Sequence, residues 1–107
     1  MSAKTLELQA KVQLPILEVI ILKDEDRYCA KCPQVDLVTE MDTPEEAFNS
    51  LLEMIREYTD DYLKRKNAFL KSPNRFHHYP YVLQIAKCKN EWELRELIEV
   101  RYGSLHL

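Results

Sequence analysis

The chain has 107 residues, of which 46% are hydrophobic and 31% charged, and its formal net charge is −3. This size and composition fit one globular domain with its own hydrophobic core, and they exclude a fibrous or disordered protein. The apolar run 14–22 is too short to span a bilayer and contains Pro15 and Glu18. Because the three cysteines come without a secretory signal, we expect reduced thiols and a cytoplasmic protein.

The first 41 residues have the patterns of β-strands. Between Thr5 and Leu14, hydrophobic and polar residues alternate with a period of two, which predicts a half-buried strand. Pro15 has no N–H to donate and marks a bend or a break. Three further strands are predicted in chain order: Ile16–Lys23, Arg27–Cys32 and Leu37–Met41. With a polar turn at residues 24–26, these three segments are expected to form an antiparallel meander.

A helix is predicted from Pro44 to about Asn67. Thr43 fits the N-cap position, Pro44 the first helical position, and Glu46 completes a capping box. Apolar residues then recur at spacings of three and four: Ala47, Phe48, Leu51, Leu52, Met54, Ile55, Tyr58, Tyr62 and Leu63. The basic run 64–66 falls in the last turn, where cations favour the helix dipole, so it does not require a nucleic acid.

Residues 68–107 have less regular patterns. Tyr81–Lys87 fits either a strand or a short helix, and Pro80 favours the helix. Asn90 is a candidate N-cap for a helix over Glu91–Tyr102, with Gly103 as a left-handed residue after its end. Because the sequence contains no flexible linker, residues 1–67 are predicted to form a sheet-and-helix unit on which residues 68–107 pack as a C-terminal extension.

The predicted fold class is therefore α+β. We expect a three- or four-stranded, mainly antiparallel sheet with the long helix on one face, followed by a helical C-terminal segment.

One stretch resembles a known family. The residues that carry the likeness are Tyr28, Ala30, Cys32-Pro33, Asp36–Thr39 and Asp42–Ala47. They are similar to the HicB-like family, the antitoxin domains of HicA/HicB toxin–antitoxin systems and their stand-alone relatives. The likeness spans roughly residues 14–63, and Met41 replaces a glycine of the family pattern. The resemblance implies a reduced ribonuclease H-like topology and a protein that masks a small, RNA-cleaving HicA-like toxin.

Charge is distributed unevenly along the chain. Residues 1–67 hold 9 Lys or Arg and 14 Asp or Glu, whereas residues 68–107 hold 6 and 4. An acidic portion suits a basic toxin, although a solvated charged surface explains it as well. The candidate partner-binding residues are Asp24, Glu25, Asp26, Asp36 and Glu40.

The alternative function is a stand-alone HicB-like scaffold or ligand-binding module without a toxin. Such a protein would form a homo-oligomer, because aromatic residues of the C-terminal portion are suited to anchor an interface. The candidate interface residues are Tyr79, Tyr81, Trp92 and Tyr102.

The sequence predicts no catalytic residue, metal or cofactor. Cys29 and Cys32 point to opposite faces of a strand, so they cannot chelate as a pair. His77-His78 could serve as a base or stack on RNA, but no nucleophile lies at a recognisable spacing, which favours a surface loop. The acidic residues fit turns and caps better than a two-metal nuclease site. Residues 75–89 offer too few cations to predict a DNA-binding module.

Overall fold

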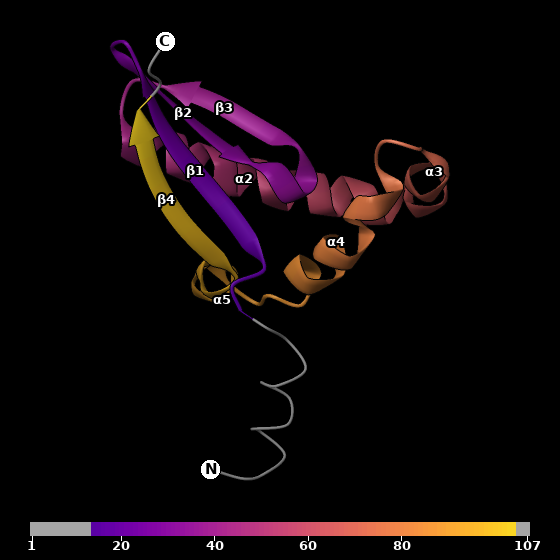
Figure 1. Cartoon of the computed structure of the whole chain (residues 1–107). Helices are drawn as coiled ribbons and strands as arrows, with labels where there is room; N and C mark the ends of the chain where they lie inside the picture. The colour runs from indigo at the N-terminus through magenta and orange to yellow at the C-terminus, as the bar shows by residue number, and fades with distance from the viewer. Residues whose placement is uncertain (1–13, 105–107) are drawn as a thin grey trace, which may run out of the picture.

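A computed structural model describes residues 14–104 of the chain (Figure 1). The strand predicted for residues 5–14 falls outside this range except for Leu14. The elements follow one another as β1 (Leu17–Asp24), β2 (Arg27–Cys32), η1 (Pro33–Val35), β3 (Leu37–Met41), α2 (Pro44–Lys64), α3 (Lys66–Lys71), η2 (Phe76–His78), α4 (Tyr79–Ala86), α5 (Glu91–Glu96) and β4 (Ile98–Ser104). Within this range, no helix is long and apolar enough to cross a membrane.

The four strands form one sheet in the order β3-β2-β1-β4. β1 pairs with β2 and β2 with β3 in antiparallel fashion, which confirms the predicted meander. β4 returns beside β1 in parallel register, from Leu17 opposite Ile98 to Lys23 opposite Ser104. The α+β prediction is confirmed, and β1 becomes a central strand that is paired on both sides.

The helix predicted over Glu91–Tyr102 is wrong in its second half, because α5 ends at Glu96 and residues 98–104 form β4. The Asn90 cap is present, since its side-chain oxygen accepts a hydrogen bond of 2.9 Å from the Glu93 N–H. Beyond α5, pairing with β1 outweighs local helical periodicity: Val100 lies opposite the fully buried Val19. Gly103 lies inside this strand and has no positive φ, so its predicted role after a helix is also wrong.

The long helix begins as predicted. The Thr43 hydroxyl accepts a hydrogen bond of 3.1 Å from the Glu46 N–H and donates one of 2.9 Å to the Glu46 carboxylate. The helix ends at Lys64, three residues earlier than predicted, because Arg65 leaves helical geometry with φ −119° and ψ 37°. The chain then turns into α3.

α2 lies along one face of the sheet (Figure 1). Alternate β1 residues Leu17, Val19 and Ile21 are buried on that face. Together with residues from the other elements they form one core: Ala30, Cys32, Val35, Ala47, Leu51, Leu52, Ile55, Ile85, Leu94 and Leu97. The last three belong to residues 68–107, so the C-terminal portion contributes to the same hydrophobic core.

Candidate functional site

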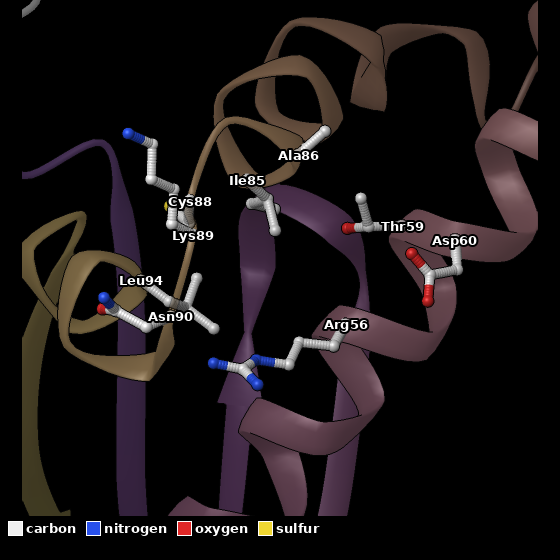
Figure 2. A pocket seen from close by; sticks show the side chains of 9 residues that line it. All are labelled: Arg56, Thr59, Asp60, Ile85, Ala86, Cys88, Lys89, Asn90 and Leu94. Atoms are coloured by element: carbon white, nitrogen blue, oxygen red, sulfur yellow. The ribbon is translucent and has the colours of Figure 1, made fainter.

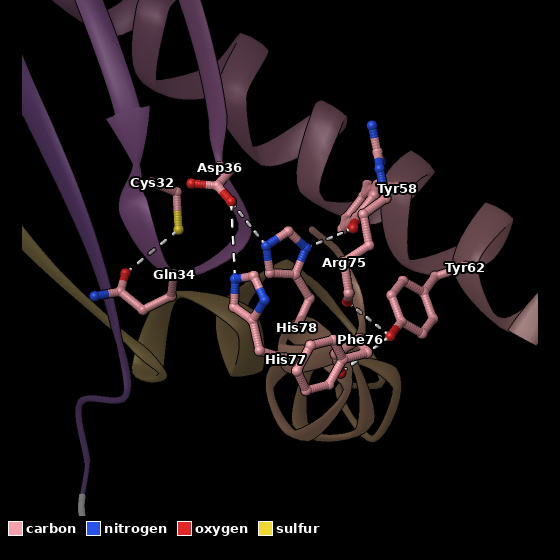
Figure 3. A network of polar contacts seen from close by, with 9 residues as sticks. All are labelled: Cys32, Gln34, Asp36, Tyr58, Tyr62, Arg75, Phe76, His77 and His78. Carbon is pink, nitrogen blue, oxygen red and sulfur yellow. Dashed lines mark hydrogen bonds and ion pairs between the residues drawn. The ribbon is translucent and has the colours of Figure 1, made fainter. Parts of the chain in front are cut away.

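A polar network joins the β2–β3 turn to α2 and η2 (Figure 3). Asp36 closes η1 in the left-handed region, with φ 54° and ψ 43°, a conformation that Asp tolerates better than most residues. Its Oδ2 lies 3.0 Å from Nε2 of His78, whose Nδ1 lies 2.6 Å from the Tyr58 hydroxyl oxygen. His78 therefore bridges the sheet and the long helix.

His78 is the centre of this network and is only 2% exposed. Burial lowers the pKa of His78, and its hydrogen bond to Asp36 partly opposes that shift. A neutral ring satisfies both neighbours, because Nε2–H donates to the Asp36 carboxylate while Nδ1 accepts from the Tyr58 hydroxyl. Burial also raises the pKa of Tyr58, which keeps its hydroxyl protonated for that bond.

Aromatic side chains hold residues 66–79 against α2. The buried Tyr62 donates a hydrogen bond of 2.9 Å to the Arg75 carbonyl and stacks on Phe69 with ring centroids 4.7 Å apart. The Arg75 guanidinium lies 5.5 Å from the ring centroid of Tyr58 and also of Phe69. These contacts fix the position of η2, and with it the position of His78.

Sequence reasoning missed this network. The His77-His78 pair was predicted to lie in a surface loop, which fits the exposed His77 but is wrong for the buried His78. The helical spacing places Tyr58 and Tyr62 only in an apolar stripe. One signal for the network was present in the sequence. Two tyrosines lie four residues apart on one helix, and buried tyrosine hydroxyls need hydrogen-bond partners, which the aromatic-rich segment near Arg75 supplies.

Among the described residues, one group could hold a metal ion: Asp36, His77 and His78 offer ligand atoms that all lie within 4.8 Å of one another. The cysteines do not add to it. Burial raises the pKa of Cys32 to about 11, so this side chain stays a neutral thiol, and burial also raises the pKa of Cys29.

A hollow of about 190 Å³ opens between α2, α4 and α5 (Figure 2). Arg56 reaches from α2 toward Leu94 and Asn90, and Asp60 and Lys89 lie at its rim. Small-molecule pockets usually enclose about 300–1,000 Å³, so this hollow is small for an organic cofactor.

The five predicted partner-binding acids fall at two ends of the sheet. Asp24 ends β1, and Glu25 and Asp26 form the turn to β2. Glu40 lies at the same end, where Arg27 contacts its carboxylate at 3.1 Å. Asp36 lies at the other end of β2, about 20 Å away for a strand of this length. The structure thus brings four of the acids together and separates the fifth.

The four predicted interface aromatics also differ in exposure. Trp92 on α5 and Tyr102 on the edge strand β4 are 73% and 75% exposed. Tyr79 and Tyr81 are half-buried: Tyr79 stacks on Tyr62, and Tyr81 packs against the core.

The fold has a match among solved structures. A crystal structure of the antitoxin part of a predicted toxin/antitoxin system from Syntrophomonas wolfei subsp. wolfei matches this chain with a TM-score of 0.73 at 24% identity, over 95% of this chain and 72% of that chain. A family model for PHD-like proteins, described as "Antitoxin of toxin-antitoxin, RelE / RelB, TA system", matches residues 1–100. The chain therefore belongs to this antitoxin family. No curated protein matches it.

Membership of an antitoxin family indicates a non-catalytic regulatory protein and implies a toxin partner. The antitoxin class implied by the HicB resemblance is thus confirmed, whereas its HicB branch stays a prediction.

Proposed function

We propose that this protein neutralises a small, basic, RNA-cleaving toxin by binding to it and covering its RNA-binding face. The observation that carries the proposal is the acidic end of the sheet, where the exposed residues Asp24, Glu25 and Asp26 end β1 and turn the chain toward β2. Glu40 and Asp42 add two carboxylates there, against the two cations Lys23 and Arg27. A surplus of negative charge on a rigid hairpin is suited to a basic partner.

Occlusion is the mechanism that this surface supports. The acidic end would compete with RNA for the toxin's cations, and electrostatic complementarity would set mainly the association rate and the choice of partner. Asp36 belongs to the predicted contact set but lies at the opposite end of β2, so it would contribute through a second contact area. Both proteins would act in the cytoplasm.

Two toxin classes are candidates for the partner. The HicB-like resemblance implies a HicA-like toxin, and the β-meander followed by α2 fits the topology that this resemblance implies. The family description instead names RelE/RelB systems, which makes a RelE-type toxin the other candidate. Co-expression with one toxin of each class distinguishes them, because only the cognate toxin should be neutralised and co-purify in a stoichiometric complex.

The proposed surface is tested by a triple variant in which Asp24, Glu25 and Asp26 are replaced by alanine. We expect slower association with the toxin and a weaker dependence of the rate on salt concentration, both measured by surface plasmon resonance. The matched control replaces three exposed acids on α2, Glu53, Glu57 and Asp60, and should leave both quantities unchanged. Equal behaviour of the two triple variants would refute the proposed surface.

A homo-oligomer is the second candidate function, favoured by the exposure of Trp92 and Tyr102. Large exposed aromatic side chains are typical anchors of an interface. The protein alone should then sediment as a dimer or tetramer, and W92A or Y102A should shift it toward the monomer. A monomer at all concentrations tested would remove this candidate.

A further inference from the structure

The cluster of Asp36, His77 and His78 draws its ligands from two segments that are far apart in sequence (Figure 3). Asp36 closes the turn between β2 and β3, and the two histidines are consecutive in η2. Oδ2 of Asp36 lies 3.0 Å from Nε2 of His78 and 3.9 Å from Nε2 of His77.

These separations match the edges of a metal coordination polyhedron. A tetrahedral ion with bonds of about 2.0–2.1 Å places its ligand atoms about 3.3–3.4 Å apart, which falls between the two observed distances. His77 is exposed and can adjust its ring without disturbing the core. Two imidazoles and one carboxylate are a donor set that suits Zn²⁺, Co²⁺ and Ni²⁺ better than Mg²⁺ or Ca²⁺.

Tyr58 supplies the outer contact that such a ligand requires. A metal bound at Nε2 of His78 replaces the proton on that atom, and the ring then carries its proton on Nδ1. Because the Tyr58 oxygen lies 2.6 Å from Nδ1, it can accept this N–H and hold the imidazole in the metal-binding tautomer. The Tyr58–His78 contact can therefore be kept when a metal binds, with Nδ1–H as the donor in place of the Tyr58 hydroxyl.

Space for the ion and further ligands lies beside the cluster. A hollow of about 180 Å³ is lined by Asp36, His78 and Arg75 together with Val35, Leu37 and Asn74. This volume exceeds the roughly 30 Å³ that a water molecule occupies in the liquid, so one or two waters can complete the coordination. The Arg75 cation near His78 opposes an incoming cation, whereas the Asp36 carboxylate favours it.

We propose that Asp36, His77 and His78 form a binding site for a divalent transition-metal ion such as Zn²⁺, which clamps the β2–β3 turn to η2. The bound ion would link Asp36, at the end of η1, to η2, which lies between α3 and α4 in the chain. The metal-binding proposal does not depend on which toxin the protein neutralises, although Asp36 belongs to both proposed sites.

The test titrates the full-length protein with Co²⁺ under reducing conditions and follows the visible absorption of the ion, then displaces Co²⁺ with Zn²⁺. We expect one ion per chain with a spectrum of nitrogen and oxygen ligands. H77A and D36N each remove a direct ligand, so each should weaken Co²⁺ binding by at least about tenfold. Loss of an outer-shell partner alone lowers metal affinity at least that much. Y58F should weaken it about 10–100-fold.

The variants are chosen to fold. The His77 side chain is exposed, and the amide oxygen of Asn at position 36 can still accept the hydrogen bond from Nε2–H of His78. The control D60N removes an exposed acid on α2 and should bind Co²⁺ like the unaltered chain. Three results would each overturn the proposal. They are Co²⁺ binding that is unchanged in D36N, loss of Co²⁺ binding in D60N, and a sulfur-to-cobalt charge-transfer band from the cysteines.

Discussion

The described chain contains two regions that reach their structure in different ways. Residues 17–64 form three strands and a helix whose neighbours in space are neighbours in sequence, through a tight turn, η1 and a capped helix start. Residues 66–104 depend on distant partners: His78 contacts Asp36, and β4 pairs with β1. Local patterns therefore specify the first region, whereas the second region depends on contacts with the first.

The largest effect should come from core residues, one in each region. Leu51 and Leu94 are 0% and 1% exposed, so L51A and L94A should each lower the free energy of unfolding by about 2–5 kcal/mol. Because both regions share one core, urea denaturation of each variant should give a single transition by far-UV and by near-UV circular dichroism. L63A, at a side chain that is 37% exposed, should cost less than about 1 kcal/mol. Separate transitions for L94A would show that the C-terminal region unfolds by itself.

The next effect concerns the contact between the regions. Y58F removes the hydroxyl that serves Nδ1 of the buried His78, and an unsatisfied buried group costs about 1–3 kcal/mol. Hydrogen exchange should increase most in residues 76–86, because η2 loses its hold on α2. Y102F, at an exposed ring, should change the free energy of unfolding by no more than about 0.5 kcal/mol. An equal effect of the two substitutions would contradict a structural role for the network.

A smaller effect on stability is expected at the two helix caps, one in each region. Thr43 and Asn90 each accept a hydrogen bond from the N–H three residues later, so T43A and N90A should each cost about 1 kcal/mol. T43A should slow folding if α2 belongs to the folding nucleus, whereas N90A should mainly speed unfolding. Stopped-flow kinetics separates these outcomes. A folding rate lowered more by N90A than by T43A would reverse the proposed order of the two regions.

The smallest effect is expected at Gly103. A Cβ at this position would come within 3.1 Å of Cδ2 of Leu22, the mobile end of a half-buried side chain. Since Gly103 has no positive φ and lies in a strand, G103A should shift the free energy of unfolding by no more than about 0.5 kcal/mol. A loss above about 1 kcal/mol, measured by urea denaturation, would show that Leu22 cannot move aside.

The sequence predicted the first region well because its signals are local. The Thr43 cap, the apolar run of β1 and the polar turn that follows it each lie within a few residues of the structure they specify. β4 was not predicted, because Asn90, Leu94, Leu97 and Ile98 fit a helix over Glu91–Tyr102 and only pairing with the edge of β1 selects the strand. The Asp36–His78 contact spans 42 residues and carried no spacing signal, so the candidate metal site could not be predicted either.

The parallel pairing of β1 with β4 leaves one edge of β1 without its partner until β4 has been synthesised. β1 leaves the ribosome about eighty residues before its second neighbour, and until then its free N–H and C=O groups form an open strand edge. A chain cleaved in the exposed stretch at Lys87 or Lys89 could lose β4 and return to that state. The intact protein and its cleaved form would then differ in their tendency to aggregate, because only the cleaved form offers β1 to another chain.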